Sequence, residues 1–287
     1  MTMPHGIGII DTMMSVGLEG TAEAYERVRP LLRDEESRRG SKDTLVYLFK
    51  GNMAKQHSIE HVLEQMDEYG VERSMISVSD RRVTAQRALR EHPDRFFADY
   101  EVDPNEGMDA LRTIDRMKRD WDIKAVSTTP SMVFPQVPLG DKKMYPIYAK
   151  CIELDIAFVT TAGVPGPRVP AAPQDPHQLD EICWFWPELR IVVRHGAEPW
   201  TEMLVKLMLK YPGLHFTTTG FAPKYYPKAI IDFANTRGAE KVLYGGHFPM
   251  GLTLERIMTE LPDLPLRDHV WPKFLRENSL RVFKLKS

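Results

Sequence analysis

The strongest constraint on the fold is an alternation of two patterns along the chain. Eight short apolar runs, rich in β-branched or aromatic residues, are each followed by turn residues. These runs are Gly6–Asp11, Arg73–Ser79, Phe96–Val102, Lys124–Thr128, Ala157–Thr161, Leu189–Arg194, Leu214–Thr219 and Val242–Gly245. Segments with helical periodicity lie between them, and the clearest ends on Gly70, as glycine-terminated helices do. The chain therefore reads strand, helix, strand throughout.

This alternation predicts an α/β fold with a parallel sheet, because near-continuous apolar strands need helices on their exposed faces. Eight repeats predict closure into a single (β/α)8 barrel of the TIM type, one domain over residues 1–287. An open, doubly wound sheet is the structural alternative. No GxGxxG or GxxxxGK loop follows any of the runs, which disfavours the nucleotide-binding form of that alternative.

Two segments interrupt the alternation. Residues 17–57 form a long insertion after the first strand, with charged, helical sequence at 19–39 and an apolar patch, TLVYLF, at 44–49. In a barrel, such an insertion lies on the catalytic face. The second segment, Gly163–Pro176, is rich in proline, which predicts a stiff loop without helix or strand after the fifth strand.

Composition narrows the class of partner. The formal net charge is −2 and no segment is dominated by Lys and Arg, so neither nucleic acid nor an anionic membrane is indicated, and a small molecule is expected. The two cysteines, Cys151 and Cys183, are too few for a disulfide framework and are expected to be buried thiols. With no export signal and no apolar stretch of about 20 residues, we expect a soluble, cytoplasmic protein.

Seven segments together resemble a known family over nearly the whole chain. They are IIDT, MDEYGVERSMISV, HPDRFFADYEVDP, MYPIYAKCIELDIAFVTTAG, IVVRHGAEPW, VLYGGHFP and RENSLRVFKL. In order and spacing they resemble the amidohydrolase superfamily, in the branch of aminocarboxymuconate-semialdehyde decarboxylase and related aromatic-acid decarboxylases and hydrolases. The resemblance implies a barrel enzyme that acts on a small molecule, and a homodimer.

The resemblance also implies a divalent metal held by an HxH pair, two further histidines and an aspartate. At these positions this sequence has Met13, Ser15, Thr161, His195 and His247, so that only His195 keeps its expected identity. Because catalytic zinc ordinarily takes three protein ligands, we predict an enzyme without metal or other cofactor. A divalent metal held weakly by His195 and His247 is the alternative.

His195 and His247 are the predicted catalytic pair. Each follows an apolar strand directly, at the end of the barrel where such enzymes place their chemistry, and His247 is expected to titrate near neutrality. His195 could instead only bridge the barrel top by hydrogen bonds. Asp11, which ends the first run, is predicted to orient a histidine or activate water, and capping of local backbone N–H groups is the alternative.

Four further residues are predicted to contact substrate. Ser15 and Thr161 offer hydroxyl groups to a carbonyl, and Met13 offers adaptable apolar surface or fills the barrel. Arg168, in the proline-rich loop, is the preferred partner for a carboxylate, since Arg194 should point away from its neighbour His195 if the strand continues.

These residues predict an amidohydrolase-related hydrolase or carbon–carbon lyase of the decarboxylase type, acting on an apolar carboxylate or carbonyl compound through proton transfer by His195 and His247. A metal-dependent hydrolase or decarboxylase with a reduced ligand set is one alternative. The other alternative is a non-catalytic barrel that binds a ligand or serves as a subunit of a complex. Sequence drift after a loss of catalysis would replace metal ligands in this way.

Overall fold

The computed structural model describes residues 3–4, 6–17, 19–39 and 57–286, and its strands form a nearly closed parallel barrel. The strands are β1 (Ile9–Met14), β2 (Val71–Ser77), β3 (Phe96–Glu101), β4 (Ala125–Thr128), β5 (Ala157–Thr161), β6 (Ile191–Arg194), β7 (Leu214–Thr218) and β8 (Val242–Tyr244). They pair in sequence order, each parallel to the next. The predicted (β/α)8 barrel is confirmed.

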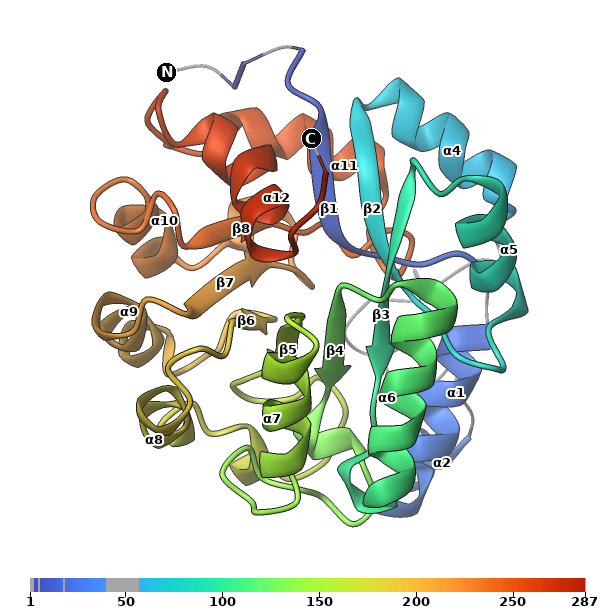
Figure 1. Cartoon of the computed structure of the whole chain (residues 1–287). Coiled ribbons are helices and arrows are strands. Elements are labelled where there is room, and N and C mark those ends of the chain that lie inside the picture. Colours follow the sequence, from blue (N-terminus) through green and yellow to red (C-terminus); the bar gives the residue numbers. More distant parts are fainter. Residues whose placement is uncertain (1–2, 5, 18, 40–56, 287) are drawn as a thin grey trace.

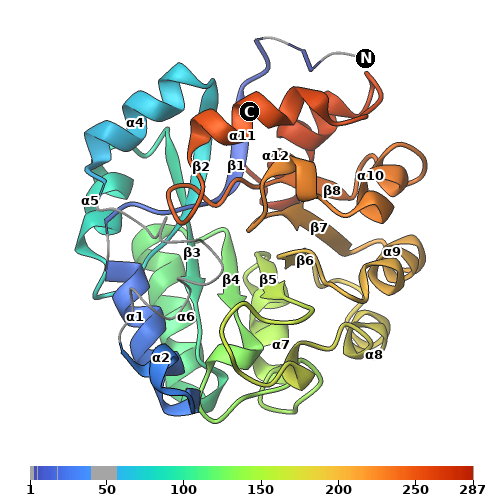
Figure 2. The same ribbon diagram turned by 180° about the vertical axis from the view of Figure 1, so that it is seen from behind.

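The helices surround the strands, as Figures 1 and 2 show from opposite sides. They are α1 (Glu19–Val28), α2 (Glu35–Arg38), α4 (Ile59–Glu68), α5 (Val83–Glu91), α6 (Met108–Trp121), α7 (Tyr145–Glu153), α8 (Gln178–Phe185), α9 (Thr201–Lys210), α10 (Lys228–Ala234), α11 (Leu254–Glu260) and α12 (Asn278–Val282). In α4, Ser58 caps the first turn by accepting from the His61 N–H, and Gly70 follows the helix at φ +72°.

The barrel interior changes from apolar to polar along the strands. An apolar group that includes Ile10, Phe97 and Val192 fills one part, and Phe283, just after α12, packs against Phe97 with ring centroids 5.8 Å apart. Further along, Thr12 of β1 and Thr217 of β7 place their hydroxyl oxygens 2.6 Å apart. Polar groups therefore gather toward the C-terminal ends of the strands, where barrel enzymes place their sites.

Backbone hydrogen bonds close the seam between the first and last strands. The His247 N–H donates to the Met13 carbonyl at 2.9 Å, and the Ser15 N–H donates to the Phe248 carbonyl at 3.0 Å. These bonds join the segment after β8 to the end of β1. This closure places the end of β1 directly beside His247.

The observed element boundaries differ from the predicted ones for local reasons. β1 begins three residues later than predicted, since Gly6 has a φ of +78°, and it extends to Met14, which pairs with Ile76 of β2. In the proline-rich loop a single 3-10 turn forms at Ala172–Gln174, so the prediction of no helix there is wrong to that extent. A proline in the first turn is compatible with it, because the N–H that proline lacks has no helical partner there.

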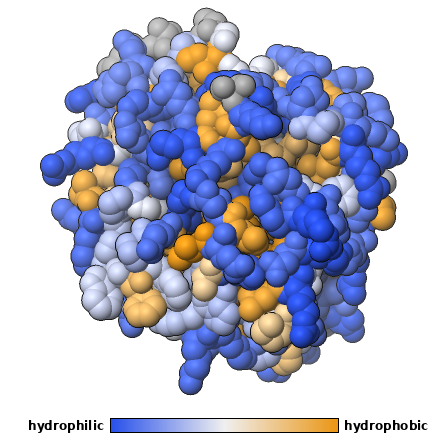
Figure 3. All heavy atoms as spheres, viewed as in Figure 1, coloured by the Kyte–Doolittle hydropathy of each residue, from blue (hydrophilic) through white to orange (hydrophobic). Residues whose placement is uncertain are grey.

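The insertion after β1 forms the predicted helices, α1 and α2, with a 3-10 turn at Arg29–Leu31 between them, and the TLVYLF patch lies outside the described residues. Cys151 and Cys183 are buried and unpaired, as predicted. The face in Figure 3 is mostly hydrophilic, with small separate apolar patches. In the described part of the chain, no helix has both the length and the apolar character needed to cross a membrane.

Candidate active site

The structure brings the two predicted histidines together at the C-terminal end of the barrel. His195 directly follows β6, His247 lies three residues beyond the end of β8, and their ring centroids are 5.3 Å apart in an edge-to-face arrangement. Both have positive φ angles, +66° for His195 and +75° for His247, which residues with side chains rarely adopt. Strained backbone of this kind is concentrated at functional sites.

Hydrogen bonds hold each ring in place. The backbone N–H of His195 donates to Thr219 Oγ1 at 3.1 Å, and the same oxygen lies 2.9 Å from the ring nitrogen Nδ1 of His195. His247 Nδ1 lies 2.9 Å from the Met250 carbonyl oxygen. Because a carbonyl only accepts, Nδ1 of His247 carries the hydrogen, and the lone pair of the neutral ring is on Nε2.

Both histidines are neutral at pH 7. Burial lowers the pKa of His247 to about 4, with a further contribution from Arg194. Burial, His247 and Arg194 lower the pKa of His195 well below its usual value. The prediction that His247 titrates near neutrality is therefore wrong, because sequence position does not reveal burial or a nearby guanidinium group.

Arg194 is the main site residue that sequence reasoning misplaced. It ends β6, is 7% exposed, and donates from Nε to Thr161 Oγ1 at 3.3 Å and from Nη2 to Thr129 Oγ1 at 3.1 Å. Strand alternation does point it into the barrel, as it does Thr161. Alternation fails at His195, whose positive φ lies outside the strand, so Arg194 and His195 are close to each other despite being adjacent in sequence.

A network of charges links the insertion to the barrel mouth. Glu101, at the end of β3, lies 3.2 Å from Arg27 of α1 and 3.5 Å from Arg82, and Arg82 also donates to Glu23 of α1 at 2.7 Å. Although burial acts to raise it, the charges of Arg27, Arg82 and Arg194 hold the pKa of Glu101 at about 2. These ion pairs place α1, the first part of the insertion, at the C-terminal end of the barrel, where the insertion was predicted to lie.

The residues at the end of β1 lie beside the histidines in different ways. Met13 and Ser15 are joined to the segment around His247 through their backbones. Asp11 lies fully buried, and its Oδ1 accepts from the N–H groups of Met13 and Gly246, both at 2.9 Å. These are the bonds of the capping alternative. Burial raises the pKa of Asp11 to about 7, against the effect of these two bonds.

Arg168 lies with α2 rather than with the histidine pair. Its Nη1 donates to Asp34 Oδ1 at 2.9 Å and to Glu36 Oε2 at 2.7 Å, which ties the proline-rich loop to the N-terminal turn of α2. Arg168 thus forms ion pairs with two carboxylates of the protein itself, whereas Arg194 is the arginine that lies buried inside the barrel.

The donor set does not fit the divalent metal that the resemblance implies. Within the described ranges, no three His, Cys, Asp or Glu side chains are grouped so that they could hold a metal ion. Thr161 accepts a hydrogen bond from the buried guanidinium of Arg194, and a second cation placed beside that group would be repelled. Met13 and Ser15 are not usual ligands for zinc or manganese.

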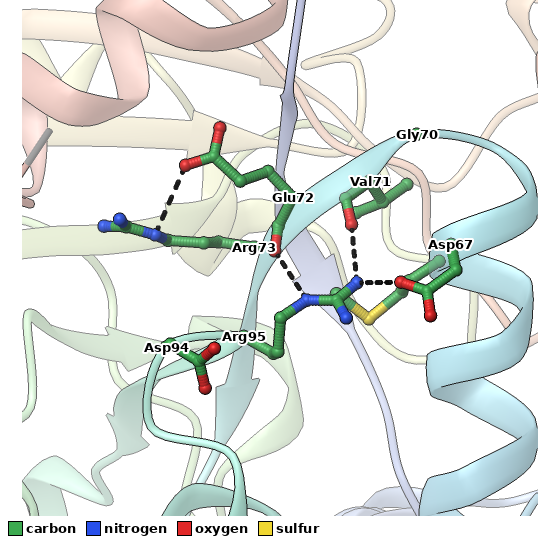
Figure 4. A pocket seen from close by; sticks show the side chains of 8 residues that line it. Asp67, Gly70, Val71, Glu72, Arg73, Asp94 and Arg95 are labelled. Carbon is green, nitrogen blue, oxygen red and sulfur yellow. Dashed lines mark hydrogen bonds and ion pairs between the residues drawn. The ribbon is translucent and has the colours of Figure 1, made fainter.

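Two hollows lie at opposite ends of the strands. One of about 370 Å³ is lined partly by Glu101 and Arg27, beside the mouth. The other, of about 450 Å³, lies where β2 begins and is shown in Figure 4. There Arg95 donates to the carbonyls of Val71 and Glu72 at 3.1 and 3.0 Å and pairs with Asp67 at 2.7 Å. These contacts link α4 to β2, and we interpret this second hollow as structural.

Comparison with known proteins identifies the family. The family model described as amidohydrolase matches residues 43–285, so the chain belongs to the amidohydrolase family. The match begins after β1, so Met13 and Ser15 lie outside it. No curated protein matches the sequence.

Solved structures share the fold at low sequence identity. An uncharacterised TIM-barrel protein from Bordetella bronchiseptica is 20% identical with a TM-score of 0.71, over 96% of this chain and 98% of that one. The 5-carboxyvanillate decarboxylase of Sphingomonas paucimobilis is 15% identical with a TM-score of 0.71, over 98% and 100%. The 5-carboxyvanillate decarboxylase of Novosphingobium aromaticivorans was solved in complex with manganese and 4-hydroxy-3-methoxy-5-nitrobenzoic acid. It is 17% identical with a TM-score of 0.67, over 98% of this chain and 97% of that one.

Proposed function

We propose that this protein is a small-molecule hydrolase or carbon–carbon lyase that works without a metal, and that His195 and His247 transfer the protons. The observation that carries the proposal is the pair of rings with centroids 5.3 Å apart at the C-terminal end of the barrel. Both side chains are held by hydrogen bonds and both are neutral at pH 7. A neutral imidazole has a lone pair that can accept a proton, and the low pKa values make both rings weaker bases than an exposed histidine.

The hydrogen bonds support different roles for the two rings. His247 Nδ1 donates to the Met250 carbonyl, so Nε2 is the atom that accepts a proton. The backbone N–H of His195 donates to Thr219 Oγ1, the same oxygen lies 2.9 Å from His195 Nδ1, and we propose that the Thr219 hydroxyl donates its hydrogen to Nδ1. In that tautomer His195 carries its hydrogen on Nε2 and donates it. Asp11 acts through the backbone, by holding Met13 and Gly246 in place.

The proposed substrate is an apolar carboxylate or carbonyl compound. Thr161 and Ser15 supply hydroxyl groups to its carbonyl, and Met13 supplies apolar surface. Two of the similar structures are decarboxylases of an aromatic carboxylate, and one of these is complexed with a nitrobenzoic acid, which supports this class of compound.

The test is turnover by single histidine variants. A panel of aromatic and aliphatic carboxylates, with their esters and lactones, is screened with the wild type to find a substrate. We expect His195→Ala and His247→Ala each to lower kcat by about 100-fold or more, whereas Arg168→Ala, with its charge paired at α2, retains it. Unchanged turnover in both histidine variants would contradict the proposal.

A metal-dependent reaction is the second candidate, favoured by the manganese in the Novosphingobium structure. Elemental analysis of protein purified without chelator from metal-supplemented cells separates the two candidates. Near-stoichiometric zinc or manganese that His195→Ala and His247→Ala release would support the metal enzyme. Metal far below one equivalent, together with turnover that survives chelator treatment, would support the metal-independent enzyme.

A further inference from the structure

Arg194 is a buried cation with few partners. It is 7% exposed, and its two hydrogen bonds go to the uncharged hydroxyl groups of Thr161 and Thr129. A guanidinium group carries five N–H donors, so most of its donor capacity is unused by these two bonds. In the part of the chain that the structure describes, no carboxylate lies within the 4.0 Å of an ion pair with Arg194.

The nearest acidic group does not fill that role. Glu101 is close enough for Arg194 to influence it, yet its ion pairs are with Arg27 at 3.2 Å and Arg82 at 3.5 Å. Glu101 is therefore shared among three cations and contacts two of them. A buried guanidinium without a contact anion is costly, and a bound anion relieves that cost.

The surroundings of Arg194 suit a carboxylate better than a metal ion or a phosphate. The barrel end that holds it combines one guanidinium with hydroxyl groups and two neutral imidazoles, so a single negative charge balances it. A planar carboxylate accepts two parallel hydrogen bonds from one guanidinium edge, whereas a doubly charged phosphate would leave a buried charge unpaired.

We propose that Arg194 is the carboxylate-binding residue of this enzyme, which grips a monoanionic substrate so that the bond beside its carboxyl or carbonyl group lies at His195 and His247. This inference rests on the proposed function, since it assigns the substrate class and its anchor to that same site. Arg168, the other candidate, already has Asp34 and Glu36 as partners at 2.9 and 2.7 Å.

The experiment is calorimetric titration with benzoate and with benzamide, a neutral ligand of nearly the same shape. We expect the wild type to bind benzoate about tenfold or more tightly than benzamide, because only the carboxylate forms charge-assisted bonds to the guanidinium. Arg194→Met should abolish this preference and Arg194→Lys should retain part of it, since Lys keeps the charge without the two-pronged geometry. Arg168→Met, which removes the same charge elsewhere, should bind like the wild type.

Two results would overturn the inference. One is a wild type that binds benzoate no more tightly than benzamide, and the other is an Arg194→Met or Arg194→Lys variant with undiminished preference for benzoate. Circular dichroism and thermal unfolding establish that each variant is folded, and Arg194→Lys remains informative should Arg194→Met not fold.

The histidine variants separate this inference from the proposed function. His195→Ala and His247→Ala should keep the preference for benzoate over benzamide while they lose turnover of the substrate found by screening. Full turnover in those variants together with loss of benzoate binding in Arg194→Met would overturn the catalytic roles and leave the carboxylate site. Loss of turnover in the histidine variants together with an undiminished benzoate preference in Arg194→Met would overturn the carboxylate site and leave the catalytic roles.

Discussion

Asp11 is expected to make the stability of the protein depend on pH. Burial raises the pKa of its carboxyl group from 3.8 to about 7 in the folded state. Each pKa unit corresponds to about 1.36 kcal/mol, so the shift amounts to about 4 kcal/mol. The folded state holds the proton more tightly than the unfolded state, so this stabilisation is fully present below a pH of about 4 and is lost as the pH rises through about 7.

The assay is urea unfolding of the wild type and of Asp11→Asn at several values between about pH 4 and pH 8. The Asn carbonyl can still accept from the N–H groups of Met13 and Gly246, and its amide does not titrate. All other groups are common to both proteins, so they cancel in the difference between the two unfolding free energies. As the pH rises from about 4 to about 8, the stability of Asp11→Asn should increase by about 4 kcal/mol relative to that of the wild type.

A difference that stays constant within about 1 kcal/mol over this range would refute the reasoning. It would mean that the folded protein solvates the Asp11 carboxylate in a way that its full burial does not suggest. Burial and the charge of Asp11 raise the pKa values of Tyr226 and Tyr244, so their hydroxyl groups are the ones to re-examine in that case.

Three further substitutions test the packing around the site, each by urea unfolding at neutral pH. Glu101→Gln should cost about 3 kcal/mol, because it leaves Arg27 without its largely buried anion, and a loss under about 1 kcal/mol would contradict this. Ser58→Ala should cost about 1 kcal/mol by removing the cap of α4, with Ser58→Asp as the control that restores it. Gly163→Ala should cost about 2 kcal/mol or more, since φ is +95° and a Cβ would lie 2.7 Å from the Ala197 carbonyl carbon; wild-type stability would refute that close approach.

The fold was predictable because it depends on a pattern repeated along the chain. Each of the eight apolar runs became a strand, and the errors in the strands were confined to their ends, as at β1. There the end of the strand depends on the pairing of Met14 with Ile76 of β2, which is distant in sequence and which a local pattern cannot reveal. Short-range rules did predict the end of α4 at Gly70, because that signal is itself local.

The site was predictable only in part, because tertiary contacts decide the chemistry of each group. His195 and His247 were found from their positions after strands, but their low pKa values come from burial and from Arg194. Strand alternation predicts that Arg194 and His195 point apart, and the rule fails here because His195 already lies outside β6. An arginine as the last residue of an otherwise apolar strand is a signal that could have found it, and the acidic end of β3 at Glu101 is another.

The seam between β1 and β8 has a consequence for how the protein is made. The Gly246 N–H and the Asp11 carboxylate that it bonds are separated by 235 positions along the chain. During synthesis the histidine pair and its neighbours can come together only after the last strand has been made and has packed beside the first. A ligand therefore cannot bind this site on a growing chain, and its stabilising effect is available only once β8 has been made and has closed the barrel.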